Sequence, residues 1–217
     1  MTMPFKTPIL RAYFIAGTQD IKDPNLTLPE VLTQALKAGI TAFQYREKGP
    51  GSLDATAKVK MAETLRDLCT TYRVPFIVDD DVALAREVGA DGIHVGQKDE
   101  RVTSVIQEVG QTMFVGLSCD TEEQVKVANQ TSGISYLGSG PVYPTGSKAD
   151  ADPVIGVTGL KKLVKLSQRP VVAIGGITEE NIAELPDTGA AGAAVISMIA
   201  QSSDITQTVK RMRTVFG

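Results

Sequence analysis

Carboxylates follow two apolar segments of the chain at positions where they could share one metal ion. Asp79, Asp80 and Asp81 come directly after the apolar segment Phe76–Val78, and Asp99 follows the next apolar segment. Hard carboxylate oxygens with few soft ligands nearby suit Mg²⁺, which proteins usually hold by one or two carboxylates together with substrate phosphates and water. We therefore predict that Asp80 and Asp99 bind Mg²⁺.

Helix capping is the alternative for this acidic run, because negative charge is favoured at a helix N-terminus. For Asp79 and Asp81 both interpretations stay open. For Asp80 capping is the weaker one, since Asp99 offers it a partner for binding a metal. Three adjacent carboxylates would also repel one another without a cation nearby.

Three cationic side chains follow two other apolar segments. Arg46 and Lys48 come after Ala42–Tyr45, and Lys148 comes after Tyr136–Ser139. A single Lys or Arg is usually a solvated surface group, so only their shared placement is informative. Arg can hold two phosphate oxygens at once, and Lys adds a compact charge. Together with two carboxylates, these cations predict a metal-bridged diphosphate site.

A second anion site is expected further along the chain. Gly175 and Gly176 follow Val171–Ile174, and Ser197 follows Ala193–Ile196. Glycine lets the backbone approach an anion closely, and a helix N-terminus presents unpaired N–H groups to it. A pair of glycines is as often a simple tight turn, but Ser197 after the next segment strengthens the phosphate interpretation.

The remaining polar candidates are neutral. His94 is the only histidine, and a lone histidine is more often structural than catalytic. Since one histidine would have to serve everything, the sequence contains no Ser–His–Asp or Cys–His set. Gln44 ends an apolar segment, where its amide could recognise a heterocycle by hydrogen bonds. Cys69 and Cys119 lack metal-ligand spacing and are predicted to be reduced thiols.

The positions of these residues depend on the elements around them. Along the chain, β-rich segments alternate with segments whose apolar residues recur at helical spacing. The predicted strands are Ala12–Ala16, Ala42–Tyr45, Phe76–Val78, Gly92–Val95, Phe114–Leu117, Tyr136–Ser139, Val171–Ile174 and Ala193–Ile196. The predicted helices are Leu28–Leu36, Leu53–Tyr72, Val82–Val88, Val102–Val109, Glu122–Asn129, Thr158–Leu166, Glu179–Leu185 and Ile205–Val215. Most of the strands are almost continuously apolar, as expected when both faces of a sheet are covered. Such alternation predicts parallel βαβ units.

Eight βα units in 217 residues match the lower end of the size range of the (β/α)₈ barrel. We predict an α/β protein with one domain, a TIM barrel spanning residues 1–217. An open doubly wound sheet is the main alternative, but Gly17-Thr18-Gln19-Asp20 does not supply the glycine-rich fingerprint typical of one. In a barrel the predicted site residues would meet at one end, because they all follow strands.

Composition narrows the classes of partner. The net charge is −3, with scattered basic residues and 42% hydrophobic residues, which predicts no nucleic-acid partner. Lys6 and Arg11 interrupt the first apolar stretch, so no signal peptide is expected, and no apolar run is long enough to span a bilayer. We predict a cytoplasmic protein with small-molecule ligands and no membrane partner; a homo-oligomer is compatible with the sequence.

Several motifs resemble those of the thiamin phosphate synthase family over essentially the whole chain. They are Gln44-Tyr45-Arg46-Glu47-Lys48, the segment Ala90–Asp99, the segment Gly138–Thr145 with Lys148, and the segment Ala173–Ile177. The resemblance implies that a hydroxymethyl-pyrimidine pyrophosphate is joined to a thiazole phosphate, giving thiamin phosphate and pyrophosphate. Pyrophosphate would leave first, and the thiazole nitrogen would capture the resulting pyrimidine cation.

The resemblance also implies roles for individual residues. Asp80 and Asp99 would bind Mg²⁺, and the catalytic residues holding the pyrophosphate would be Arg46, Lys48, Ser118 and Lys148. The pyrimidine would contact Gln44, Tyr13 and His94, and the thiazole phosphate would contact Thr145, Ser147, Gly176, Ile196 and Ser197. Asp79 stands where the family usually has asparagine, and it is counted here among the substrate-binding residues. As a carboxylate it would repel pyrophosphate unless it joins the metal, is protonated or turns away.

Three rival functions share parts of this pattern. A thiazole tautomerase of the same superfamily would share the barrel but would not need the full pyrophosphate-binding set. A non-catalytic phosphate sensor would have little reason to keep paired metal carboxylates opposite three cations. A sugar-phosphate isomerase would need a general base near the phosphate, and no candidate stands out. The segment from Tyr143 to Asp152, with its Pro, Gly and Ser residues, is predicted to be a mobile cover over the site.

Overall fold

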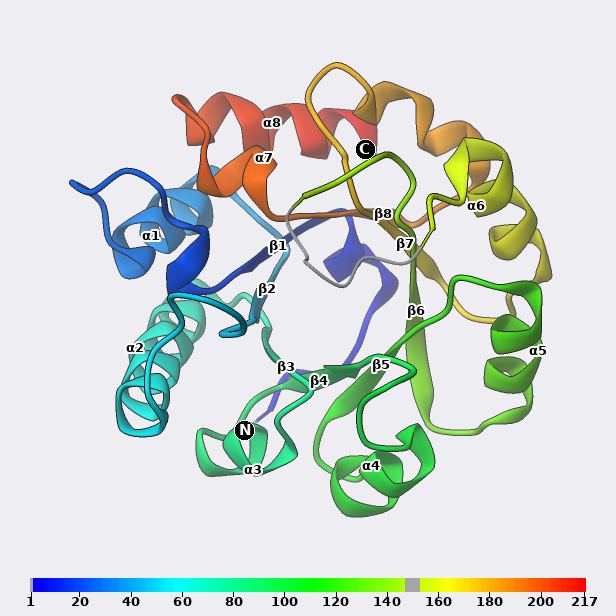
Figure 1. Cartoon of the computed structure of the whole chain (residues 1–217), viewed down its shortest axis with the longest axis horizontal. Coiled ribbons are helices and arrows are strands. Elements are labelled where there is room, and N and C mark those ends of the chain that lie inside the picture. Colours follow the sequence, from blue (N-terminus) through cyan, green and yellow to red (C-terminus); the bar gives the residue numbers. More distant parts are fainter. Residues whose placement is uncertain (1, 147–152) are drawn as a thin grey trace.

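A closed parallel barrel of eight strands forms the centre of the molecule in a computed structural model that describes residues 2–146 and 153–217 (Figure 1). The strands are β1 (Ala12–Ala16), β2 (Ala42–Tyr45), β3 (Phe76–Asp79), β4 (Gly92–Val95), β5 (Phe114–Ser118), β6 (Ile134–Ser139), β7 (Val171–Ile174) and β8 (Gly192–Val195). Each strand pairs with the next, and β8 pairs with β1. The predicted TIM barrel is therefore confirmed.

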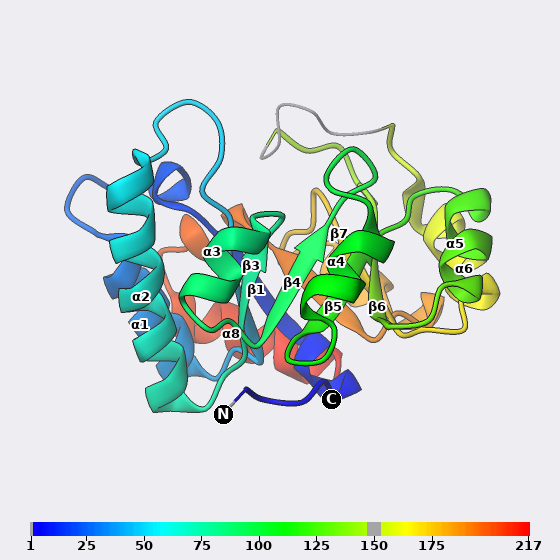
Figure 2. The same cartoon turned by 90° about the horizontal axis from the view of Figure 1, so that it is seen from below.

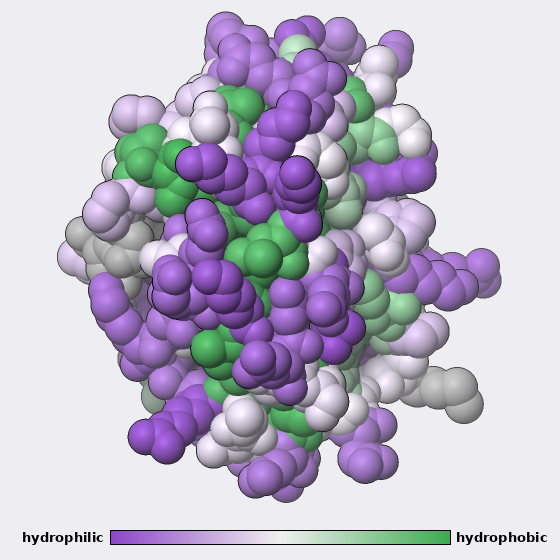
Figure 3. Space-filling view, turned by 90° about the vertical axis from the view of Figure 1, so that its right-hand side faces the viewer, coloured by the Kyte–Doolittle hydropathy of each residue, from purple (hydrophilic) through white to green (hydrophobic). Residues whose placement is uncertain are grey.

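Helices surround the barrel and cover the outer face of the sheet (Figure 1). They are α1 (Leu28–Ala38), α2 (Ala55–Tyr72), α3 (Val82–Glu87), α4 (Val102–Val109), α5 (Glu122–Gln130), α6 (Gly156–Leu166), α7 (Ser197–Ala200) and α8 (Ile205–Val215). On the side of α5 and α6, hydrophilic side chains cover most of the surface, with hydrophobic ones showing between them (Figure 3). No helix among residues 2–146 and 153–217 is long and apolar enough to cross a membrane.

The predicted helix Glu179–Leu185 is wrong. This segment instead forms two short 3-10 helices, η3 (Ile182–Glu184) and η4 (Pro186–Thr188). Pro186 has no amide hydrogen to donate and its ring clashes with a preceding helical turn, so no α-helix continues through it. The end of the last predicted strand also differs, because Ile196 lies beyond β8 and precedes α7.

Strand residues alternate between two packed layers. The side chains of Phe14, Phe43 and Phe76 point outward under the helices. The ring centroids of Phe14 and Phe43 are 5.4 Å apart, and those of Phe43 and Phe76 are 6.2 Å apart. Inside the barrel lies a second cluster that includes Tyr13, Ile15, Ala42, Ile77, Phe114, Tyr136, Val172 and Ala194. This inner cluster contains two tyrosines, so the barrel interior is not purely apolar.

The amino-terminal segment closes one end of the barrel. The ring of Phe5 lies 5.7 Å from that of Tyr136, with the two planes 7° apart, and 5.6 Å from that of Phe114. Nearby, the amide of Met3 donates to Asp91 Oδ1 at 2.7 Å. Both chain termini lie at this end (Figure 2). A ligand must therefore enter from the opposite end, where the strands finish.

We expect Phe43→Ala to lower the free energy of unfolding by about 3–5 kcal/mol, because it removes a fully buried ring from between the barrel and its helices. Urea unfolding followed by circular dichroism measures this. Val127→Ala is the control, since Val127 is 64% exposed and its truncation should change stability by about 0.5 kcal/mol or less. Similar losses in the two variants would contradict this description of the core.

Candidate active site

A cavity of about 230 Å³ opens at the carboxyl end of the barrel. Its lining comes from the strand ends and following loops of β2 to β8, and includes Arg46, Lys48, Asp79, His94, Asp99, Ser118, Thr145, Gly176, Ile196 and Ser197. A smaller cavity of about 20 Å³, lined by Tyr13, Gln44 and His94 among others, lies inside the barrel. Of the described residues that were predicted from the sequence to bind substrate, all but Tyr13 and Gln44 line the larger cavity, and these two line the smaller one. Ser147 and Lys148 lie outside the described residues.

Ion pairs dominate one side of this cavity. The ammonium of Lys48 contacts Asp80 Oδ2 directly and lies 3.6 Å from Asp99 Oδ1 and 3.9 Å from Asp79 Oδ2. Arg46 Nε lies 3.4 Å from the same oxygen of Asp79. Asp80 and Asp99, paired from the sequence alone, therefore do converge, and the point on which they converge is occupied by a lysine.

The backbone after β3 explains why Asp80 faces this cluster. Asp80 has a φ of +51°, in the left-handed region that aspartate tolerates better than most residues. Its amide donates to the carbonyl of His94 at 2.8 Å, and the amide of Asp81 donates to the carbonyl of Asp79 at 2.7 Å. The chain therefore turns tightly, so the side chains of Asp80 and Asp81 point in different directions.

Asp81 is a helix cap. Its Oδ1 accepts from the amide of Leu84 at 3.0 Å, and its Oδ2 accepts from Lys58 at 2.8 Å. Burial alone would raise the pKa of Asp81, but the hydrogen bond and charge of Lys58 and the Leu84 amide outweigh it, and the pKa is lowered. The capping interpretation is confirmed for Asp81. Asp79 instead ends β3 and pairs with Arg46 and Lys48, so it does not turn away from the site.

The fit of this cluster to a metal ion depends on Lys48. Within the described ranges, no group of three or more histidine, cysteine, aspartate or glutamate side chains could hold a metal as it stands. The donors are nevertheless hard carboxylate oxygens, and those of Asp79, Asp80 and Asp99 already gather around one positive charge. Such donors suit a hard divalent cation once the ammonium moves aside.

The glycine pair after β7 is required by close backbone packing. Gly175 and Gly176 have φ values of +94° and +66°. A Cβ on Gly175 would lie 2.5 Å from Pro141, and one on Gly176 would lie 2.5 Å from the carbonyl oxygen of Pro144. The tight-turn interpretation therefore explains both glycines. They also line the cavity beside Ser197, the first residue of α7, so the two interpretations are compatible.

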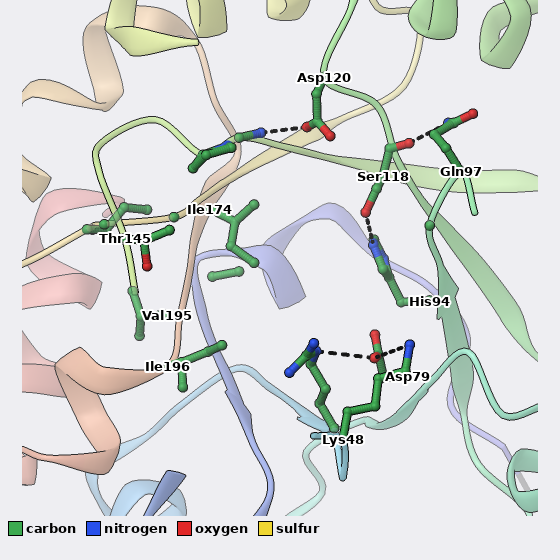
Figure 4. Close-up of a pocket in the computed structure, with 18 of the residues that line it drawn as sticks. Lys48, Asp79, His94, Gln97, Ser118, Asp120, Thr145, Ile174, Val195 and Ile196 are labelled. Atoms are coloured by element: carbon green, nitrogen blue, oxygen red, sulfur yellow. Dashed lines mark hydrogen bonds and ion pairs between the residues drawn. The ribbon is translucent and has the colours of Figure 1, made fainter. Parts of the chain in front are cut away.

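Hydrogen bonds connect the neutral site residues in one chain. Ser118 Oγ lies 3.0 Å from His94 Nε2 (Figure 4). His94 Nδ1 lies 3.0 Å from the hydroxyl of Tyr136. Tyr136 lies 3.0 Å from the hydroxyl of Tyr13, which accepts from Gln44 Nε2 at 2.8 Å. Sequence reasoning missed Tyr136, because a tyrosine inside an apolar strand gives no sign that its hydroxyl joins a polar chain.

Two further residues were missed beside the cavity. Asp120 Oδ1 accepts from the amide of Gly140 at 2.8 Å, which ties the loop after β5 to that after β6. Gln97 Nε2 donates to the carbonyl of Ser118 at 2.6 Å. A signal for both existed in the sequence, since Asp120 lies two residues beyond β5 and Gln97 two residues beyond β4.

Comparisons with known proteins agree with this architecture. A family model described as thiamine monophosphate synthase matches residues 12–199. The chain is 56% identical to the thiamine-phosphate synthase of Lactiplantibacillus plantarum, covering 99% of this chain and 98% of that protein. It is 51% identical to the thiamine-phosphate synthase of Levilactobacillus brevis, and the alignment covers 100% of this chain and 99% of that protein. It is 31% identical to a solved structure of thiamine phosphate pyrophosphorylase from Pyrococcus furiosus, with a TM-score of 0.83 and coverage of 97% and 98%.

The match begins at the first residue of β1 and ends in α7, so it contains every described group that lines the cavity. The chain belongs to the thiamine monophosphate synthase family.

Proposed function

We propose that the chain makes thiamin phosphate by joining hydroxymethyl-pyrimidine pyrophosphate to a thiazole phosphate, with release of pyrophosphate. The names of its relatives support this activity. The observation that carries it is the convergence of two cations and three carboxylates on one side of the cavity. Fixed cations, together with a metal held by the carboxylates, would stabilise the charge of a diphosphate leaving group.

Charge balance supports a metal-bound pyrophosphate. Arg46 and Lys48 carry two positive charges, whereas Asp79, Asp80 and Asp99 carry three negative ones when ionised. These five groups therefore carry a net charge of −1 and would repel free pyrophosphate. Asp80 and Asp99, with Asp79 beside them, would hold Mg²⁺, which neutralises charge on the leaving pyrophosphate when bound.

Arg46, Lys48 and Ser118 are the described groups proposed to hold the pyrophosphate. The guanidinium of Arg46 can bind two oxygens, and the ammonium of Lys48 is within reach of the same region once it leaves the carboxylates. Lys148 is proposed for the same role from its place in the sequence. Since these positive charges are already fixed around the leaving group, little reorganisation accompanies its departure.

A dissociative reaction needs no protein nucleophile, and the thiol of Cys119, which follows the lining residue Ser118, is not an activated one. Burial, helped by the charge of Asp120, raises the pKa of the Cys119 thiol to about 12, so this thiol stays protonated and unreactive. We propose that pyrophosphate departs first and that the thiazole nitrogen attacks the resulting cation. Thr145, Gly176, Ile196 and Ser197 line the other side of the cavity and are proposed to orient the thiazole phosphate for this attack.

We expect purified protein, given both substrates and Mg²⁺, to form thiamin phosphate and pyrophosphate in equal amounts. Chromatography of thiamin phosphate and a coupled pyrophosphate assay measure the two products. A thiazole tautomerase would instead interconvert thiazole tautomers and release no pyrophosphate. That result would replace the proposed activity with the rival one.

Asp80→Asn should lower kcat/KM by about 100-fold or more, because it removes a charged metal ligand while asparagine still tolerates the left-handed backbone. Mn²⁺ binding followed by electron paramagnetic resonance should weaken in parallel. Asp81→Asn is the matched control, since it removes a neighbouring charge but keeps a side chain that caps α3 well. Equal effects of the two substitutions would argue against a metal-binding role for Asp80.

Lys48→Met should have opposite effects on metal binding and on turnover. Without substrate, we expect Mn²⁺ to bind about tenfold more tightly, because the competing ammonium is gone and three carboxylates remain. Turnover should fall, because one pyrophosphate-binding cation is lost. Lys58→Met is the control, since Lys58 pairs with Asp81 outside this cluster. Weaker Mn²⁺ binding in Lys48→Met would show that the ammonium does not compete with the metal.

A further inference from the structure

Five side chains from five strands form a continuous hydrogen-bonded chain across the barrel interior. In order they are Gln44 on β2, Tyr13 on β1, Tyr136 on β6, His94 on β4 and Ser118 on β5, with successive distances of 2.8, 3.0, 3.0 and 3.0 Å. Gln44 and the two tyrosines are at most 2% exposed. Gln44 and Tyr13 line only the small inner cavity, whereas His94 and Ser118 line both cavities. The chain therefore runs from the inner cavity to a wall that the two cavities share.

Two glycines make room for the rings of this chain. A Cβ on Gly116 would lie 2.3 Å from the ring of Tyr136 and 2.5 Å from His94 Nδ1. A Cβ on Gly138 would lie 3.2 Å from His94 Cε1. From the closed end of the barrel, Phe5 stacks on Tyr136. The rings are thus packed on several sides, which leaves them little freedom to change partners.

Counting protons gives this chain a direction. Burial, and the nearby Tyr136, raise the pKa of Tyr13, and burial also raises that of Tyr136, so each phenol keeps its single proton. Gln44 Nε2 donates to Tyr13, so the Tyr13 proton goes to Tyr136 and the Tyr136 proton goes to His94 Nδ1. The histidine then carries its proton on Nε2 and donates it to Ser118 Oγ. The hydroxyl proton of Ser118 is not used by the chain and can be donated toward the outer cavity.

One other neutral arrangement satisfies every bond, and it reverses all of them. If the Gln44 amide turns so that its oxygen accepts from Tyr13, then Tyr136 donates to Tyr13 and accepts from Nδ1–H of His94. His94 Nε2 then accepts the Ser118 proton, which is no longer available to a ligand. Because each bond dictates the next, intermediate arrangements leave a buried donor or acceptor unsatisfied, which is costly.

We propose that Tyr13, Tyr136 and His94 form a relay of positioning residues that couples the orientation of the Gln44 amide to the donor direction of the Ser118 hydroxyl. This inference rests on the proposed function in assigning the pyrimidine to the Gln44 end and the pyrophosphate to the Ser118 end. A heterocycle that holds the Gln44 amide in its present orientation makes Ser118 a donor to the leaving pyrophosphate. Tyr136 thereby gains a role in the reaction without touching either substrate.

Nitrogen-15 NMR of the imidazole tests the relay in the free protein, because His94 is the only histidine and its two nitrogens distinguish the tautomers. At slightly alkaline pH we expect the Nε2–H tautomer. Gln44→Glu places an acceptor at the far end and should reverse the chain, giving the Nδ1–H tautomer. Tyr13→Phe cuts the chain between Gln44 and Tyr136, and it leaves His94 Nδ1 as the acceptor in the chain for the Tyr136 proton. Adding Tyr13→Phe to Gln44→Glu should therefore restore the Nε2–H tautomer.

Tyr72→Phe, on the outer helix α2, is the control and should leave the tautomer unchanged. The Nδ1–H tautomer in the unmodified protein would overturn the relay. So would an unchanged tautomer in Gln44→Glu, or an Nδ1–H tautomer in the double variant Gln44→Glu with Tyr13→Phe, each folded by circular dichroism. The readout does not depend on catalysis, so it remains decisive even if the protein forms no thiamin phosphate. If the synthase activity is present, Tyr136→Phe should weaken binding of inorganic pyrophosphate with Mg²⁺ by about tenfold.

Discussion

Closure of the parallel sheet is the constraint on which the rest of this molecule depends. Every neighbouring pair of strands is parallel, and β8 pairs with β1 through Ala12↔Ala193 and its neighbours. All eight strands therefore point the same way around one axis. Every residue that follows a strand then faces the same end, whatever its position in the sequence. Groups as distant as Arg46 and Ser197 therefore line one cavity, and the opposite end is left to be filled by Phe5 and the inner aromatic rings.

Oppositely charged side chains gather at the open end of the barrel and offset most of one another's charge. Carboxylates and cations that would each be costly to place alone stabilise one another, with Lys48 paired to three aspartates and Arg46 to one of them. On the proposed function, the same pairs would keep the cations from binding an anion that arrives without a metal. Preference for a metal-bound diphosphate over a simple phosphate can thus come from the protein's own ion pairs, rather than from the shape of the cavity.

Polarity inside the barrel follows a different rule, because burial penalises any donor or acceptor without a partner. Tyr13, Tyr136 and Gln44 satisfy one another in sequence, and His94 with Ser118 completes the set at the cavity. The absence of side chains at Gly116 and Gly138 is what lets the rings approach. A barrel interior filled only with aliphatic side chains would be simpler to pack. It would contain no hydrogen bonds to couple the orientation of the Gln44 amide to that of the Ser118 hydroxyl.

The sequence by itself determined the barrel, the end at which the site lies and the family, because hydrophobic periodicity records which residues are buried and the motifs follow the strands. It also identified Asp80 and Asp99 as neighbours. It did not reveal that Lys48 lies among these carboxylates, that Asp81 turns away to cap α3, or that Tyr136 joins His94 to Tyr13. It also predicted a helix at Glu179–Leu185 where only short 3-10 helices form.

Hydrophobic periodicity reports the face of an element on which a residue lies. It does not report the direction of a side chain after the strand ends, nor the partner of that side chain across the barrel. Those are decided by the positive φ of Asp80 and by contacts between strands far apart in the chain, which exist only in the closed tertiary structure.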